Sequence, residues 1–167
     1  MANRQMVSAA IVAAAVAALA GAVLATPGSG ATGLVAARAA FADIVDIKFS
    51  IRDDYRGREN IQVRNAGDTV MQQITFAPGG FSGWHSHPGP AVVLIKSGEL
   101  TFYDAEDASC TGRTFSAGQA LIDPGQGHVH FALNQGTTSA EVWVTYFDVP
   151  PGLGPRDDAP APGNCPF

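Results

Sequence analysis

The chain has 167 residues, of which 46% are hydrophobic and 15% are charged, and its formal net charge is −5. This length and composition suit one folded domain with processing segments and exclude an intrinsically disordered chain. The 10 basic residues are scattered along the sequence rather than clustered, so nucleic acid is excluded as an expected partner.

Residues 1–25 have the layout of a secretory signal peptide. Arg4 precedes a long uncharged run rich in alanine and valine, which ends in the small-residue pattern Val23-Leu24-Ala25. This layout predicts export to a secreted or extracytoplasmic location, such as the cell envelope or periplasm. The run is also about 20 residues long, enough to span a bilayer, so contact with a membrane through an uncleaved anchor is the alternative.

Residues 26–43 begin with "TPGSGATG" and continue with small residues that show no clear period. This composition favours a flexible tether, with at most a short helical turn over residues 35–41. We therefore expect the folded domain to begin near Ile44.

Residues 44–149 consist of short apolar runs separated by glycine, proline, aspartate and asparagine. This pattern is typical of an all-β sandwich or barrel. In "TVMQQITF" the period of two places Gln72 on the apolar face, directed at the barrel interior, or alternatively at a strand edge where the backbone satisfies it. The run "AVVLIK" shows no alternation, which predicts a strand covered on both faces.

Residues 150–167, "PPGLGPRDDAPAPGNCPF", are too rich in proline and glycine for a helix or an extended ladder. They predict a tail laid across the barrel. In an oxidising compartment Cys110 and Cys165 are expected to form a disulfide that pins this tail, and two unpaired buried thiols are the alternative.

The four histidines fall in two pairs, His85 with His87 and His128 with His130. Spacing of two along a strand puts both members of a pair on one face, so neighbouring strands could direct three or four imidazoles at one point. Imidazole is a ligand for zinc, copper, iron and nickel. The spacing therefore indicates a metal site.

The chain also resembles the cupin family. The first cupin motif, G-x5-H-x-H-x3,4-E-x6-G, is matched by Gly79, His85, His87 and Gly98. The second motif, G-x5-P-x-G-x2-H-x3-N, is matched, with one extra residue between the proline and the second glycine, by Gly118, Pro124, Gly127, His130 and Asn134. The resemblance covers roughly residues 68–148 and implies a jelly-roll β-barrel.

By this resemblance His85, His87 and His130 correspond to the three histidine ligands of one divalent transition metal, which could be iron, manganese, nickel, copper or zinc. The fourth family ligand is a glutamate, and its position is occupied by Ala91. His128 has three readings: a fourth ligand, a residue at the barrel mouth, or an exposed turn histidine.

The absent glutamate shapes the expected function. Three neutral imidazoles leave the metal charge uncompensated, which favours a small anionic or chelating partner molecule. Some cupin dioxygenases use three histidines without the acid, so the resemblance implies an exported oxygenase-type or related enzyme. The alternatives are a non-catalytic module that binds a small molecule or metal, and a barrel whose metal site has decayed. Exposed edge strands would also allow a homodimer.

Overall fold

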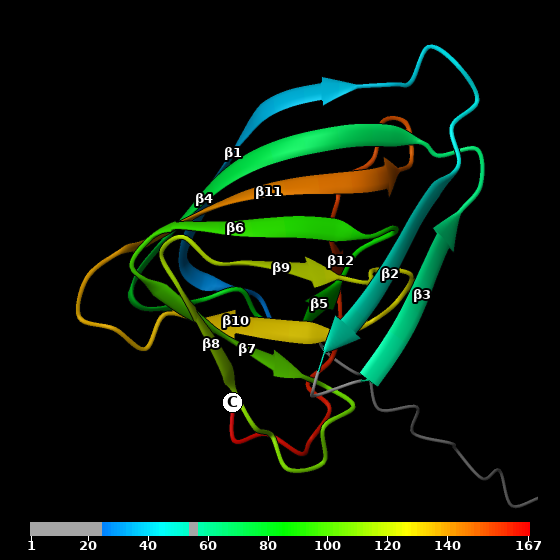
Figure 1. Ribbon diagram of the computed structural model, residues 1–167. Helices are drawn as coiled ribbons and strands as arrows, with labels where there is room; N and C mark the ends of the chain where they lie inside the picture. The colour runs from blue at the N-terminus through cyan, green and yellow to red at the C-terminus, as the bar shows by residue number, and fades with distance from the viewer. Residues whose placement is uncertain (1–24, 54–56) are drawn as a thin grey trace, which may run out of the picture.

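The computed structural model describes residues 25–53 and 57–167, and within them the chain forms strands and no helix (Figure 1). In these ranges there is accordingly no helix that is long and apolar enough to cross a membrane. The strands are β1 (Ser29–Ala39), β2 (Ile47–Asp53), β3 (Gly57–Val63), β4 (Asp68–Phe81), β5 (His85–Ser86), β6 (Ala91–Ser97), β7 (Glu99–Asp104), β8 (Arg113–Ser116), β9 (Ala120–Asp123), β10 (His130–Leu133), β11 (Ala140–Val149) and β12 (Asp157–Asp158).

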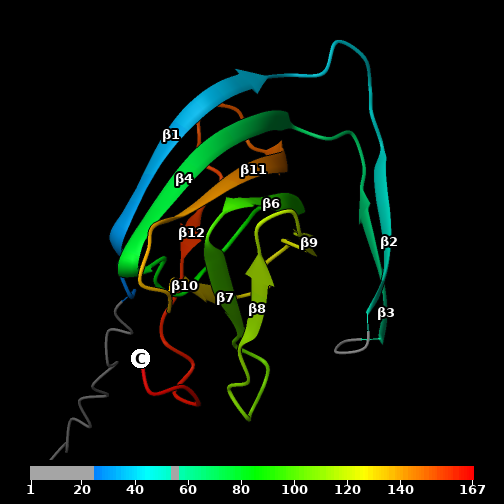
Figure 2. The ribbon, with the colours of Figure 1, turned by 60° about the vertical axis from the view of Figure 1, so that its left-hand side comes forward.

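The barrel is one antiparallel sheet that curls almost into a closed cylinder. One wall runs β1-β4-β11-β6-β9, and the other runs β8-β7-β10. The strand β10 joins the two walls by pairing with β4, and it also pairs with the short strand β5. The two walls face each other, and β8 and β9 are the free edges at the opening between them (Figure 2). This architecture confirms the predicted all-β, jelly-roll fold.

Alternation along the central strands builds the core. In β11 buried and partly buried residues alternate over almost the whole strand, so that Val142, Val144 and Tyr146 face inward. Val93 and Ile95 of β6 meet them in the same cluster. Burying an aliphatic side chain of this size stabilises a fold by about 1.5–3 kcal/mol, so this interior fixes the register of the strands that carry the histidines.

The expectation of a flexible tether over residues 26–43 is wrong for most of this segment. Residues 29–39 form β1, which pairs antiparallel with β4, and the short helical turn expected over residues 35–41 is absent because its first residues lie in this strand. Leu34 is 66% exposed and Val35 is 51% exposed. Because β1 is held by backbone pairing and buries few side chains, its sequence lacks the apolar alternation that identifies a strand.

The strand β6 is also different from the prediction that both of its faces are covered. Val93 and Ile95 are buried in the core, but Leu94 between them is 47% exposed. The continuous apolar run therefore conceals an ordinary alternation, in which one face packs inward and the other carries apolar residues at the surface.

The hairpin β2–β3 forms a separate two-stranded sheet beside the barrel (Figure 2). Its buried residues Ile61 and Val63 face inward, and the ring of Phe49 lies 5.8 Å from that of Phe147 on β11. Gln126 also donates from its side-chain amide to the backbone carbonyl of Gln62. These contacts hold the hairpin against the end of the barrel.

The C-terminal tail lies across the barrel as predicted. The strand β12 pairs with β5, and Cys110 and Cys165 form a disulfide with their Cα atoms 5.3 Å apart. The ring of Phe167 stacks on Trp84, whose indole N–H donates to the Phe167 carbonyl. The predicted signal segment lies outside the described residues except for Ala25.

Candidate metal centre

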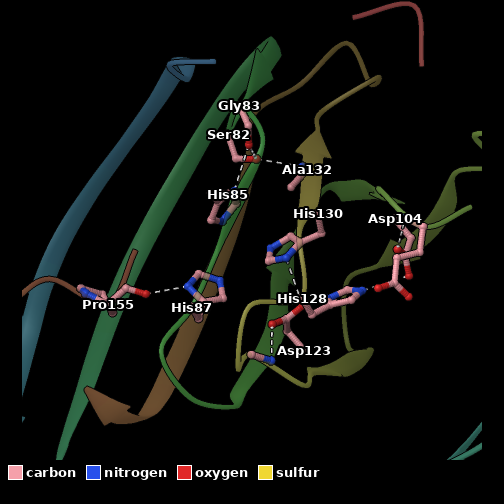
Figure 3. Close-up of polar contacts among 12 residues, drawn as sticks. Ser82, Gly83, His85, His87, Asp104, Asp123, His128, His130, Ala132 and Pro155 are labelled. Carbon is pink, nitrogen blue, oxygen red and sulfur yellow. Dashed lines mark hydrogen bonds and ion pairs between the residues drawn. The ribbon is translucent and has the colours of Figure 1, made fainter. Parts of the chain in front are cut away.

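Three buried histidines converge inside the barrel (Figure 3). His85 on β5 and His130 on β10 are direct partners across the two strands, and His87 follows β5 on the same face as His85. The ring centroids are 4.3 to 5.1 Å apart, and one ligand nitrogen from each ring lies within 4.8 Å of the others. The structure thus brings together the three histidines that the resemblance assigned to the metal.

Hydrogen bonds orient two of these rings, those of His85 and His87, in the way that metal binding requires. Nδ1 of His85 donates to the Gly83 carbonyl at 2.9 Å, and Nδ1 of His87 donates to the Pro155 carbonyl at 2.6 Å. A carbonyl only accepts, so the proton lies on Nδ1 and the lone pair of Nε2 is left for a ligand. The three donors fit a transition-metal ion with open coordination positions.

Burial keeps the first two imidazoles neutral. Burial, followed by the charge of His130, lowers the pKa of His87 to about 4. The same causes, with His87 as a further neighbour, hold the pKa of His85 well below 6.5. Neutral imidazole is the form that binds metal, so these two ligands require no deprotonation near pH 7.

A cavity of about 390 Å³ opens beside the three rings. Gln72 lines it, which confirms that this glutamine faces the barrel interior. Tyr146 lies with its ring 4.9 Å from that of His87, and burial raises the pKa of its hydroxyl. Arg156 of the tail also lines the cavity. The volume suits a small organic molecule.

Ala91 is fully buried on β6, and an acid stands on the strand beside it. In the register of β6 with β9, Ala91 is the partner of Asp123. The carboxylate of Asp123 contacts one member of the cluster, lying 3.1 Å from Nδ1 of His130, and is not part of the group formed by His85, His87 and His130 (Figure 3). Burial opposes the charge of Asp123, yet His130 and His128 hold its pKa well below the usual value. An acid thus contacts one of the three ligand rings.

His128 is held apart from the cluster by two carboxylates. Its Nδ1 lies 2.9 Å from Asp123, and its Nε2 lies 3.0 Å from Asp104. Burial lowers its pKa, but the bonds to Asp104 and Asp123 outweigh burial and raise the pKa to about 9. A charged imidazole with both nitrogens engaged has no lone pair to offer, so this geometry does not favour His128 as a fourth ligand.

His128 instead lines a second cavity of about 440 Å³, which it shares with His130, Asp123 and Asp104. The group Asp123, His128 and His130 could also hold an ion by its spacing. An ion there would have to displace the proton that the two carboxylates stabilise on His128. In the other cluster the pKa values of His85 and His87 are lowered, so no stabilised proton has to be displaced from these two rings, and we regard that cluster as the candidate metal centre.

Four residues of the site were not identified from sequence: Asp104, Asp123, Pro155 and Arg156. Asp123 carries the clearest signal, because it lies inside the second motif, directly before Pro124 in "DPGQGHVH". The contributions of Pro155 and Arg156 depend on where a tail without periodicity crosses the barrel.

Comparison with known families decides the classification. The family model described as Cupin matches residues 56–154. The chain is a cupin. This membership confirms the resemblance carried by the two histidine motifs.

Curated relatives of this cupin include germin-like proteins. One from Arabidopsis thaliana, subfamily 3 member 1, is 35% identical over 48% of this chain and 39% of its own length. An auxin-binding protein of Prunus persica is 29% identical over 50% of this chain and 40% of its own length. Among solved structures, an oxalate oxidase is 30% identical over 48% of this cupin and 41% of that chain, with a TM-score of 0.42. The cupin thus spans about two fifths of these relatives' lengths.

Proposed function

We propose that this cupin is an exported, metal-dependent enzyme of the oxygenase type or a related type, acting on a small anionic, chelating molecule. In this proposal His85, His87 and His130 hold one divalent transition metal. The observation that carries it is the convergence of three buried imidazoles, two of which donate from Nδ1 to backbone carbonyls.

When bound, such an ion would supply Lewis-acid and redox chemistry to a coordinated substrate. The protein residues supply position and charge. Three neutral ligands favour an anionic substrate, because they add no negative charge of their own. The buried hydroxyl of Tyr146 keeps its proton and can donate to a substrate oxygen, while Gln72 can donate or accept across the cavity.

Export is supported by two separate features. The Cys110–Cys165 disulfide is typical of oxidising compartments outside the cytosol. The N-terminal sequence has the layout of a secretory signal, with cleavage expected near Ala25. Mass spectrometry of the protein recovered from its producing cell would show whether the mature chain begins after that residue.

Elemental analysis of protein purified without chelator tests the metal site. About one equivalent of transition metal per chain is expected, and it should be absent from His130→Ala. Less than about a tenth of an equivalent after reconstitution with iron, manganese, nickel, copper and zinc would overturn the proposal and leave a decayed site.

Oxygen consumption then separates an enzyme from a binding module. Metal-loaded protein would be supplied with carboxylates, diketones and catechols, and substrate-dependent uptake of oxygen is expected for at least one class. Stoichiometric metal with tight ligand binding but no conversion of any substrate, by oxygen uptake or product analysis, would identify a non-catalytic module instead.

A further inference from the structure

The tail segment from residue 155 to residue 159 forms one side of the histidine cavity. The Pro155 carbonyl accepts the His87 hydrogen bond, and Asp158 pairs with His85 in the register of β12 with β5. Ala159 donates its backbone N–H to the Trp84 carbonyl at 3.0 Å. Arg156 is therefore fixed between neighbours that are themselves anchored to the strand carrying two of the ligands.

Arg156 brings a permanent positive charge to this cavity. It lines the same space as the three histidines, and its side chain is 33% exposed. Arg156 and the candidate metal centre thus face the same cavity.

The guanidinium retains donors for a ligand. Its Nε donates to Asp158 at 2.5 Å, and among the described residues this is the one hydrogen bond and ion pair formed by Arg156. The two terminal nitrogens, Nη1 and Nη2, form the fork that binds a carboxylate through two parallel hydrogen bonds. The Asp158 pair is exposed and therefore weak. It steadies the side chain without occupying that fork.

The remaining cavity wall restricts what such a ligand can carry. Apolar side chains from several strands line it: Ile74, Phe76, Val93, Leu100, Val142 and Val144. A ligand in this space can place charge at the histidines and at Arg156, but burying charge against the apolar wall would be costly.

We infer that Arg156 is the carboxylate-anchoring residue of this site. The ligand class is a small organic acid that chelates at the three imidazoles through one end and presents a carboxylate to Arg156 with the other. This inference rests on the proposed function and adds a specificity determinant that comes from the tail, outside both histidine motifs.

Anion binding to the cobalt(II)-loaded protein tests the inference without any assay of turnover. Malonate is the probe that can bridge the metal and Arg156, and azide is the probe that binds metal alone. Changes in the visible absorption of cobalt report both. Arg156→Gln should weaken the binding of malonate by about tenfold or more, since a hydrogen bond to a charged group contributes about 1.5–3 kcal/mol. The affinity for azide should change by less than about threefold, because azide makes no hydrogen bond to Arg156.

Two further variants separate the planar fork from simple charge. Arg156→Lys keeps the charge and loses the paired donors, so malonate binding should lie between the wild type and Arg156→Gln. Arg64→Gln makes the same change in net charge at an exposed position after β3 and should leave both probes unaffected. Circular dichroism would verify that every variant has the fold of the wild type.

The outcomes distinguish this inference from the proposed function. Wild-type protein that takes up no cobalt would overturn both. Stoichiometric cobalt with unchanged malonate affinity in Arg156→Gln would overturn the role of Arg156 alone. An equal weakening of malonate and azide binding would also overturn it, because it would indicate only a general electrostatic attraction of anions. Selective loss of malonate would support it.

Discussion

The two histidine pairs have the same spacing and different chemistry. His85 and His87 face backbone carbonyls and belong to a group of three ligand nitrogens within 4.8 Å. His128, two residues before His130, faces the carboxylates of Asp104 and Asp123. Spacing brought each pair near the site, but the hydrogen-bond partner decides what each ring can do.

The difference shows how one barrel can hold both neutral and charged imidazole in adjoining cavities. A carbonyl accepts one proton from a ring and leaves the other nitrogen as a lone pair. A carboxylate stabilises the charged ring, and two carboxylates raise the pKa of His128 to about 9 in spite of burial. His130 stands between these environments, because its Nδ1 faces Asp123 while its ring adjoins His85.

Removing the disulfide should cause the largest loss of stability among these variants. Of the two histidines compared, it should disturb His87 and not His128. Cys110→Ser with Cys165→Ser releases a loop of 55 residues, which should lower the free energy of unfolding by on the order of 4 kcal/mol. Urea denaturation measures this loss. Because the Pro155 carbonyl accepts the His87 hydrogen bond, metal affinity should fall. The pKa of His128, which is held by Asp104 and Asp123, should stay near 9 when followed by NMR. A fall in both would show that the pairs are not independent.

Single histidine substitutions should separate the pairs by metal affinity. His130→Ala removes a ligand and should weaken metal binding by about 100-fold or more, beyond the effect usual for groups that only orient ligands. His128→Gln should weaken it by less than about tenfold. Competition with a chromogenic chelator measures both constants. Equal losses would mean that His128 belongs to the metal centre after all.

Asp123→Asn tests the residue that connects the two pairs. Removing the carboxylate should weaken metal binding by about 10- to 100-fold, the range for partners that orient a ligating histidine. It should also lower the pKa of His128, which loses one of its two carboxylates. Asp107→Asn, an acid of the turn after β7, is the matched control. An unchanged His128 titration would contradict the bridging role.

The most gradual effects are expected in the pH dependence of the metal-free protein, because each group acts over several pH units. The folded pKa values of His85 and His87 lie below the unfolded value of 6.5. The unfolded chain therefore binds more protons below that pH, and stability falls as the pH drops from about 6.5 towards 4. The free energy of unfolding should fall by at most about 1.4 kcal/mol per pH unit for each of the two groups.

His128 should show the opposite sign. Its folded pKa of about 9 lies above the unfolded value, so its stabilising contribution is complete below pH 6.5 and is lost as the pH rises through about 9. Urea titrations between pH 4 and 10 would show both the loss of stability at acid pH and the loss at alkaline pH. His128→Gln should remove only the alkaline loss. A flat profile between pH 7 and 10 in the wild type would contradict the charged state of His128.

Much of this molecule was predictable from local pattern. Period-two alternation and turn residues predicted an all-β barrel, and a cysteine pair in a chain expected to be exported predicted the disulfide. Paired histidines, together with the cupin resemblance, identified the three imidazoles that converge in the structure. These features can be predicted from the sequence because each depends on neighbouring residues or on a fixed spacing between residues.

The tertiary structure decided what depends on contacts between distant segments. The strand β1 is defined by pairing with β4 rather than by its own side chains, so its sequence looked like a tether. The acid beside Ala91 comes from the register of β6 with β9, and Arg156 enters the cavity only because β12 pairs with β5.

The sequence by itself determined which residues can bind a metal, because donor chemistry belongs to the side chain. Only the fold decided that His87 is neutral and His128 is charged, because burial and the choice between carbonyl and carboxylate partners set the pKa of these two rings.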